Sequence, residues 1–531
     1  MKERCLAGRV GELRTRRGTI ETPYLFPVID MARQEVSLAE LMAVGFQAVT
    51  INAYLLLKRG HRGSIHELLG THELVVMTDS GAYQLLEYGS IDVDNETIVE
   101  FQKEIDSDIA VILDVPTGDS YDRDWALYTV EETLRRAQSV ANKLDRDKRL
   151  WVLPVQGGLH LDLVEKSAAE SAKLDFDLYA LGSPTRMLEK YRYDLVIDMV
   201  AASRKHIPPA KPLHLFGAGH PMMIPFAVAM GVDLFDSSSY ILFARDGRYV
   251  TSSGTRRLEQ LSCLPCCCPV CSKLDVTELL ELEPSERTRL LATHNLYAIQ
   301  LVLRETKQAI KEGRLWELLE EYSRKHPSLR RALGLIARKH ANYLEKLDPR
   351  YNSGARAPLI YSTLSLTNPR ISRALKYVRK QYTPPRTVKR LIMLPRFRRD
   401  EESITEEDHV VYYDELLGII PSELSRTYPL GHAVTPGLNE KGPSPRLIKA
   451  ILSYLRRHGE SYPDSKTVVL CAEWRASSSR LAEFVSKSGV KVEWASCFAP
   501  ISEKALEYSE RLPDNFSALN SLDNRDLSRL A

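Results

Sequence analysis

Four residues between positions 266 and 294 have the types and the spacing of a metal site. The chain carries Cys-x-Cys-x2-Cys, followed by a histidine 23 residues after the last cysteine. Thiolates and imidazole are the ligands of tetrahedral zinc, so the pattern predicts one Zn²⁺ bound by Cys266, Cys268, Cys271 and His294. Five of the eight cysteines lie within residues 263–271, which argues against a disulfide scaffold with dispersed cysteines. Cys263 and Cys267 leave open which three thiolates bind. Because four protein ligands leave no open position, the ion is expected to be structural.

A second group of candidate residues ends a series of apolar segments in the first 240 residues. Eight nearly continuously apolar segments end in polar residues, at Asp30, Asn52, Asp79, Asp114, Gln156, Ser183, His220 and Asp236. Such runs are typical of buried parallel strands, and helical stretches such as residues 124–144 and 191–206 lie between them. Eight β-α units predict a (β/α)8 barrel, a TIM barrel of the α/β class, whose active site lies at the carboxyl ends of its strands.

Three of the four aspartates among these strand ends lie in longer motifs, and their combination suits chemistry at a glycosidic carbon. They lie in MTDSGAYQ (Asp79), ILDVPTG (Asp114) and DLFDSSSY (Asp236). Two carboxylates in one pocket can serve as nucleophile and acid/base, and a third can accept hydrogen bonds from a ligand. A single aspartate at such a position is more often a cap of a loop or helix. Three together, with Gln156 and Gly182, favour a site.

The remaining sequence predicts a helical extension and a second, smaller domain. Residues 1–345 form the predicted barrel domain, with a zinc-binding insertion at about 263–294 and a helical block that breaks at His326-Pro327. Residues 346–358, rich in Asn, Gly and Pro, are predicted to be a linker.

A smaller α/β domain is predicted over residues 359–510. Its strands include VKRLIMLP and TVVLCAEW, and a helix is expected over residues 445–459. Residues 511–531 form a polar tail.

Charge is distributed unevenly along the chain. The net charge is only +2, yet residues 371–399 hold ten Lys or Arg and no Asp or Glu. Such a stripe is typical of a surface that binds phosphates, and a solvated linker is the alternative. The sequence shows neither a signal peptide nor an apolar stretch that could span a membrane. Together with clustered, reduced cysteines this predicts a cytoplasmic protein without a membrane partner.

Several longer motifs occur in order along the chain: MTDSGAYQ, VQGG, HLFGAGHP, DLFDSSSY, and PCCCPVC followed by RTRLLATHN. Together they resemble the tRNA-guanine transglycosylase family, specifically its archaeal type. The resemblance covers nearly all of residues 6–345 and continues more weakly through YPLGHAVTP near residue 430. It implies an enzyme that exchanges guanine at position 15 of the tRNA D-loop for 7-cyano-7-deazaguanine, the first tRNA-level step towards archaeosine.

The resemblance also implies roles for the two aspartates that do the chemistry. Asp236 would be the nucleophile that attacks the ribose anomeric carbon, giving a covalent aspartyl-ribose intermediate. Asp79 would act as general acid/base, although the family's nucleophile has been assigned to either position.

Base recognition follows from the same resemblance. Asp114 would accept hydrogen bonds from the ring N–H and amino group of the base. Gln156 and a backbone N–H near Gly182 and Ser183 would donate to its exocyclic oxygen. Tyr83 is a candidate stacking partner, with packing in the barrel as the alternative.

The family implies tRNA and guanine as substrates, one structural zinc per subunit and a homodimer with the zinc region near the interface. Archaeal members commonly end in a PUA domain, which is not evident here, so this module is expected to be absent or supplied by a separate protein. The basic stripe from Arg373 to Arg399 would then hold tRNA, extended by helical positions Arg330, Arg331, Arg338 and Lys339.

Two alternatives remain open: an archaeosine synthase-like paralogue and a non-catalytic RNA-binding subunit. The presence of both Asp79 and Asp236 with intact base-recognition and zinc motifs favours the exchange enzyme.

Overall fold

The structure, a computed structural model, describes residues 3–84, 93–350, 352, 354–396, 404–475, 482, 485–486 and 489–497. The chain divides into two compact units, one of residues 1–374 with 432–434 and one of the remaining residues. The predicted polar tail over residues 511–531 lies outside the described residues. Within the described part, none of the helices is long and apolar enough to cross a membrane.

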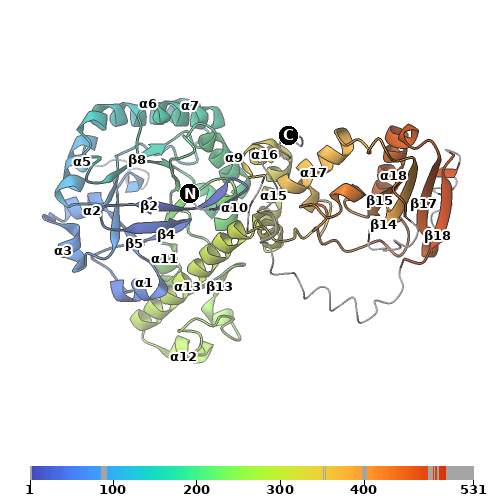
Figure 1. Ribbon diagram of the computed structural model, residues 1–531. Helices are drawn as coiled ribbons and strands as arrows, with labels where there is room; N and C mark the ends of the chain where they lie inside the picture. Colours follow the sequence, from blue (N-terminus) through green and yellow to red (C-terminus); the bar gives the residue numbers. More distant parts are fainter. Residues whose placement is uncertain are drawn as a thin grey trace. The chain divides into compact units, whose positions relative to one another are not determined.

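The first unit is built around a closed barrel of eight parallel strands (Figure 1). In chain order the strands are β4 (Tyr24–Ile29), β5 (Ala48–Asn52), β6 (Val75–Asp79), β7 (Ile109–Val111), β8 (Leu150–Val155), β9 (Leu178–Leu181), β10 (Leu213–Leu215) and β11 (Leu234–Ser237). Successive strands are neighbours, and β11 pairs with β4 to close the barrel. Each predicted apolar segment contains one of these strands, so the prediction of a (β/α)8 barrel is confirmed.

Helices connect the strands and cover the outside of the barrel (Figure 1). They are α1 (Leu38–Val44), α2 (Ala53–Lys58), α3 (Ile65–Leu69), α5 (Asn95–Glu104), α6 (Arg123–Val140), α7 (Leu161–Ala172), α8 (Thr185–Glu189), α9 (Tyr193–Arg204), α10 (Ile224–Ala229) and α11 (Ser239–Arg245). Polar side chains cap several of them: Asp122, for example, accepts hydrogen bonds from two backbone N–H groups at the start of α6. Strands enclosed by these helices are buried on both faces, which is why their sequences are continuously apolar.

A small antiparallel sheet, which the sequence analysis did not predict, lies at the amino-terminal side of the barrel. Its strands are β1 (Glu3–Cys5), β2 (Gly8–Arg14) and β3 (Thr19–Thr22). Arg9 on β2 forms a buried ion pair with Asp233, which directly precedes β11 (Nε–Oδ1 2.7 Å). The small sheet is thereby held at the amino-terminal end of the barrel, and it does not cover the carboxyl ends of the strands.

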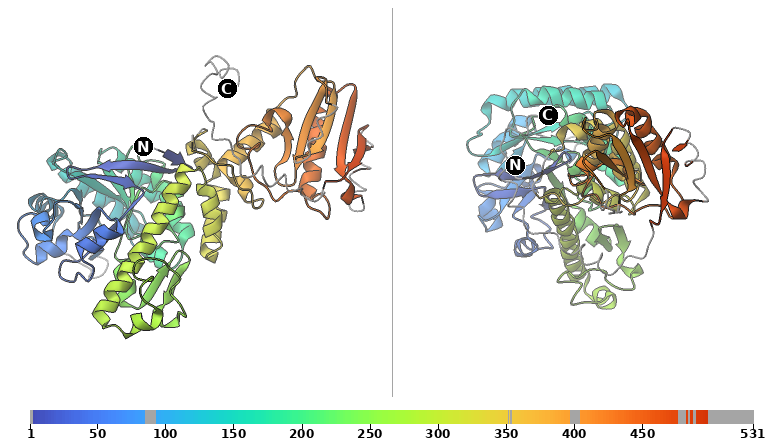
Figure 2. Two further views of the ribbon diagram at one scale, coloured as in Figure 1. Left: turned by 60° about the horizontal axis from the view of Figure 1, so that its bottom comes forward. Right: turned by 45° about the vertical axis from the view of Figure 1, so that its right-hand side comes forward.

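The segment after the barrel forms a hairpin and a set of helices. The elements are β12 (Arg248–Thr251), β13 (Gly254–Arg257), α12 (Val276–Glu281), α13 (Pro284–Lys311), α14 (Leu315–Tyr322), α15 (Pro327–Lys339) and α16 (Ala341–Leu347). Figures 1 and 2 show the hairpin and α12 beside one end of the long helix α13. The predicted break at His326-Pro327 is the start of α15, where the His326 side chain accepts a hydrogen bond from the Ser328 N–H.

The second unit contains a five-stranded sheet in the order β16-β15-β14-β17-β18. Its elements are α17 (Pro369–Lys380), which spans the division, β14 (Arg390–Pro395), β15 (Asp408–Asp414), β16 (Gly418–Pro421), α18 (Pro445–His458), β17 (Ser465–Cys471) and β18 (Lys491–Ala495). The smaller α/β region is therefore as predicted: β14 and α18 lie inside the expected segments, and β17 overlaps its segment but begins two residues earlier, at Ser465.

Two features of this region differ from the sequence analysis. The division falls between Ala374 and Leu375, later than the linker expected at residues 346–358. The reason is that Asp348 accepts a hydrogen bond from the Leu6 N–H and pairs with Arg370, so the segment packs on the first unit. In addition, neighbouring strands β17 and β18 bring together Cys471 and Cys497, which form an unpredicted disulfide.

Candidate active site

A cavity of about 850 Å³ lies at the carboxyl ends of the barrel strands. This volume is within the range of small-molecule sites, roughly 300–1,000 Å³. All seven residues predicted to act on or bind the substrate line it: Asp79, Tyr83, Asp114, Gln156, Gly182, Ser183 and Asp236. The barrel thus brings together side chains that are up to 157 residues apart in the sequence.

Asp79 occupies the last position of β6 and has a strongly perturbed acidity. Burial, followed by the negative charge of Asp236, raises the pKa of Asp79 to about 7. Its Oδ2 accepts a hydrogen bond from Asn52 Nδ2 (3.2 Å), and its Oδ1 accepts one from the Gly81 N–H (3.3 Å). A carboxyl group with this pKa can both give and take a proton near neutral pH.

Asp236 on β11 has a different environment. Its Oδ1 is 2.8 Å from His214 Nε2 and also accepts a hydrogen bond from the Gly217 N–H (3.1 Å). Gly217 has a φ of 64°, a left-handed conformation that glycine adopts without strain. Two donors therefore hold one oxygen of this carboxylate, and its side chain remains partly open to the cavity.

Asp114 and Gln156 form a buried pair on the floor of the cavity. Gln156 Nε2 donates a hydrogen bond to Asp114 Oδ2. Gln156 Oε1 accepts hydrogen bonds from the Thr117 N–H (3.1 Å) and the Ser183 hydroxyl (2.9 Å). Burial raises the pKa of Asp114 to about 6 despite the hydrogen bond from Gln156. Because an amide nitrogen carries two hydrogens, Gln156 keeps one N–H that its bond to Asp114 does not use.

The turn at Gly182 and Ser183 narrows the choice of backbone N–H for the base. The Gly182 N–H donates to the Val155 carbonyl within the barrel (3.0 Å), so this N–H cannot also bind a base. The strand pairing that takes this N–H is not visible in the sequence. A base-directed backbone N–H from this turn would have to come from Ser183, whose φ is 63°.

The four predicted metal ligands also converge. Ligand atoms of Cys266, Cys268, Cys271 and His294 all lie within 4.8 Å of one another. Cys271 Sγ is 3.3 Å and Cys268 Sγ is 3.5 Å from His294 Nδ1. Bond lengths of ~2.3 Å to sulfur and ~2.0 Å to nitrogen place tetrahedral zinc ligands about 3.5–3.8 Å apart. The cluster therefore has the dimensions of a zinc site.

Surrounding groups orient the histidine for metal binding. The Val250 carbonyl can only accept, so His294 Nε2 carries the proton and donates to it (2.9 Å), which leaves the Nδ1 lone pair for a metal. Tyr249 stacks on the His294 ring and its hydroxyl lies 3.3 Å from Cys271 Sγ. Cys263 and Cys267 are exposed and lie outside the cluster. The geometry thus selects three of the five clustered cysteines.

Comparison with known proteins gives the family. Residues 5–328 match the family described as queuine tRNA-ribosyltransferase. The chain is 48% identical over 437 residues to a tRNA-guanine(15) transglycosylase of Aeropyrum pernix, covering 80% of this chain and 85% of the relative. The chain belongs to the tRNA-ribosyltransferase family. A protein of the same description from Saccharolobus solfataricus is 42% identical over 476 residues, which is 86% of this transferase and 94% of the relative.

The large cavity of the transferase also contains residues that were not expected from the sequence. Asn52, already noted as a strand end, contacts both Asp79 and Gln84 Oε1 (3.1 Å). His214 contacts Asp236 from inside strand β10. Asn52 could have been found from its place at a strand end, whereas a histidine within an apolar strand has no distinguishing pattern. Tyr83 lines the cavity and is 36% exposed, so packing inside the barrel does not account for it.

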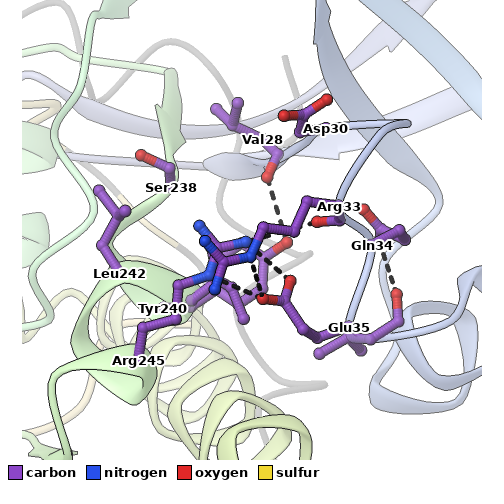
Figure 3. Close-up of a pocket in the computed structure, with 11 residues that line it drawn as sticks. Val28, Asp30, Arg33, Gln34, Glu35, Ser238, Tyr240, Leu242 and Arg245 are labelled. Carbon is purple, nitrogen blue, oxygen red and sulfur yellow. Dashed lines mark hydrogen bonds and ion pairs between the residues drawn. The ribbon is translucent and has the colours of Figure 1, made fainter. Parts of the chain in front are cut away.

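A second, much smaller cavity of the transferase lies next to the catalytic one (Figure 3). Its volume is about 80 Å³, far below that of a ligand site. Figure 3 shows the guanidinium groups of Arg33 and Arg245 directed at Glu35, with distances of 3.2 and 2.7 Å. The Tyr240 hydroxyl donates to the Val28 carbonyl (3.1 Å). These internal pairs position the loop after β4 and leave no room for a base.

Proposed function

We propose that this transferase exchanges guanine at position 15 of the tRNA D-loop for 7-cyano-7-deazaguanine. The observation that carries the proposal is the shared cavity in which two differently held aspartates face the Asp114–Gln156 pair. The relatives named tRNA-guanine(15) transglycosylase support the position of the target base.

In the first half-reaction, Asp236 acts as the nucleophile. One carboxylate oxygen forms a bond to the ribose C1′, the C1′–N9 bond breaks, and the electron pair leaves with guanine. Asp79, in its protonated form, supplies the proton that the departing base needs. The raised pKa of Asp79 supports this role because a substantial fraction is protonated near pH 7. The product is an aspartyl-ribose ester and free guanine.

The second half-reaction reverses these steps with the new base. The ionised Asp79 removes the N9 proton of 7-cyano-7-deazaguanine, N9 attacks C1′, and the ester bond to Asp236 breaks. Two inversions retain the configuration at C1′, and splitting the exchange into two displacements lowers each barrier. No oxidant, reductant or nucleoside triphosphate is required, because one glycosidic bond replaces another.

Base selection depends on Asp114. An ionised, buried carboxylate can accept the ring N–H and the amino group that guanine and 7-deazaguanines share. A base without these donors would leave the carboxylate unpaired in a buried site, which is strongly unfavourable. The remaining N–H of Gln156 suits the exocyclic oxygen of the same bases.

Zinc is proposed to bind Cys266, Cys268, Cys271 and His294 as a structural ion. When bound, it crosslinks the segment after β13 to helix α13. The cluster supplies four ligands, and its residues are absent from the lining of the catalytic cavity, so the ion has no part in the base exchange. A homodimer with this segment near its interface is proposed from the family resemblance.

The basic stripe is proposed to contact tRNA, but fewer of its cations are available than the sequence indicates. Arg373 donates to the backbone carbonyls of Glu345 and Asp348. Lys389 pairs with Glu407 and Arg390 with Asp408. Arg379, Lys380 and Arg386 are exposed and remain the best candidates for phosphate contacts.

The helical positions show the same pattern of partial pairing. Arg331 lies 3.6 Å from Asp194 and Lys339 pairs with Asp198 at 2.8 Å, whereas Arg330 and Arg338 are exposed. The latter two can extend a phosphate-binding surface. Arg398 and Arg399 lie outside the described residues.

Incorporation of radiolabelled guanine into transcribed tRNA tests the proposed function. The wild-type protein is expected to label tRNA that carries G15 and not a transcript with A15. Asp236→Ala and Asp79→Ala are each expected to lower the exchange rate by about 10³-fold or more. Unchanged exchange in Asp236→Ala would contradict the mechanism.

The same assay separates the alternatives. An archaeosine synthase-like paralogue would act on the base already installed and incorporate no guanine. A non-catalytic subunit would bind tRNA without labelling it. Asp79 and Asp236 lie in one cavity in environments that suit an acid/base and a nucleophile. This arrangement favours the exchange enzyme over the paralogue and over the non-catalytic subunit.

A further inference from the structure

His214 lies directly beside the proposed nucleophile. It is the middle residue of β10, in register with Leu234 of β11, and its side chain is fully buried. Its Nε2 is 2.8 Å from Asp236 Oδ1. Since an ionised carboxylate can only accept hydrogen bonds, Nε2 carries a proton and donates it to Oδ1.

The rest of the imidazole ring lies in apolar surroundings. Phe26 stacks against it with ring centroids 6.0 Å apart and an interplanar angle of 13°. Phe216 packs at 4.9 Å and 58°. His214 Nδ1 is buried and has no hydrogen-bond partner among the described residues. An apolar side chain would avoid burying this unpaired nitrogen, so the histidine contributes to the site chiefly through its bond to Asp236.

The two oxygens of Asp236 are held unequally. Oδ1 accepts from His214 and from the Gly217 N–H, whereas none of the described residues donates a hydrogen bond to Oδ2. Both donors therefore fix the rotation of the carboxylate about its Cβ–Cγ bond and leave one oxygen for the substrate. A positioned nucleophile reacts faster because its orientation is set before the reaction begins.

We propose that His214 is the positioning residue of Asp236, holding Oδ1 so that Oδ2 is the oxygen that attacks the ribose C1′. This inference rests on the proposed base exchange. In the aspartyl-ribose ester, Oδ1 becomes the carbonyl oxygen. When the ester breaks, the electron pair of the Oδ2–C1′ bond stays with Oδ2 and its charge is shared with Oδ1, where the His214 N–H stabilises the departing carboxylate. The imidazole keeps its proton throughout.

Two substitutions at position 214 separate positioning from packing. His214→Phe keeps an aromatic ring and removes the donor. His214→Gln retains an amide N–H with a reach similar to that of Nε2. The matched control is His340, equally a buried histidine whose Nε2 lies 2.7 Å from a carboxylate, Asp198, outside the cavity. His340→Phe removes the same kind of hydrogen bond away from the site.

Steady-state guanine exchange and thermal unfolding of these variants provide the test. We expect His214→Phe to lower kcat by about 10- to 100-fold, as for loss of a hydrogen bond to a charged group, with the KM for tRNA unchanged. His214→Gln should restore most of kcat. His340→Phe should lower the melting temperature and leave kcat unchanged.

Three results would overturn the inference: wild-type kcat in His214→Phe, a His214→Gln variant as slow as His214→Phe, or equal loss of kcat in His340→Phe. A wild-type protein that incorporates no guanine at all would instead contradict the proposed function. The two failures are therefore distinguishable in one assay.

Discussion

The two aspartates proposed to be catalytic differ in what surrounds them. Asp236 receives two hydrogen bonds on one oxygen. Asp79 is buried beside that negative charge, and its pKa is raised to about 7. One carboxylate is thus fixed by two donors, and the other can hold a proton near neutral pH, which suits a division into nucleophile and acid/base. This contrast is the physical basis for assigning the nucleophile to Asp236.

The raised pKa of Asp79 predicts a pH-dependent stability. The folded protein favours the neutral carboxyl, so the contribution of Asp79 is fully present below about pH 4 and is lost as the pH rises through about 7. Asp79→Asn is therefore expected to be more stable than wild type by about 1–3 kcal/mol at pH 8. The difference should vanish near pH 4, as measured by denaturant unfolding.

Asp30→Asn is the control for that measurement. The ion pair with Arg59 lowers the pKa of Asp30, so its stabilising effect is present at neutral pH and is lost in acid. The exposed pair is worth little, so this variant is expected to be equal to or slightly less stable than wild type at pH 8. An Asp79→Asn protein that behaves like Asp30→Asn would refute the raised pKa of Asp79 that its burial and the charge of Asp236 produce.

Gly182 is predicted to be required for base binding. A Cβ atom at this position would lie 2.2 Å from Gln156 Nε2, so Gly182→Ala must displace Gln156 from Asp114. We expect the KM for guanine to rise by about 10-fold or more, with tRNA affinity unchanged. In Gly459→Ala the nearest atom is 3.7 Å away, and exchange kinetics should be normal. Equal kinetics in both variants would exclude the close contact.

At the scale of elements, the zinc segment is predicted to stabilise α13 and the hairpin beside it. Cys271→Ser removes a ligand, whereas Cys267→Ser changes an exposed cysteine outside the cluster. Loss of a structural metal costs several kcal/mol, so Cys271→Ser should bind less zinc and melt more than about 5 °C lower. Metal analysis and calorimetry measure both. Full zinc content in Cys271→Ser, or equal loss in Cys267→Ser, would contradict the ligand set.

The barrel strands could be predicted because burial on both faces makes each of them a continuous apolar segment ending at the site. The zinc ligands were recognisable for a similar reason, since three of them lie within six residues. Other features depend on contacts between distant segments. The Gly182 N–H is occupied through pairing with β8, and His214 becomes significant only when β11 places Asp236 beside it. The pairs of Lys389 and Arg390 with acidic residues of the β15 region are equally invisible in a stretch free of Asp and Glu.

At the scale of the whole molecule, the exposed cations of the second unit are predicted to bind tRNA phosphates. Replacing Arg379, Lys380 and Arg386 by Gln should weaken tRNA binding and reduce the slope of log K against log salt by about 0.7–0.9 per lost contact. The kcat at saturating tRNA should not change, because the catalytic cavity belongs to the first unit. Filter binding at several salt concentrations measures the slope.

Lys389→Gln is the matched control for this experiment, since Lys389 is already paired with Glu407. It is expected to bind tRNA nearly as well as wild type. If the triple variant has unchanged affinity and slope, these three cations do not contact tRNA and are simply solvated.

The most direct test of the account is to locate the covalent intermediate. Denaturing the enzyme during exchange, digesting it and sequencing the ribose-modified peptide by mass spectrometry identifies the attached residue. The account predicts an ester on Asp236, accumulating in the absence of an incoming base and absent from Asp236→Asn. An adduct on Asp79, or guanine exchange without any adduct, would contradict it.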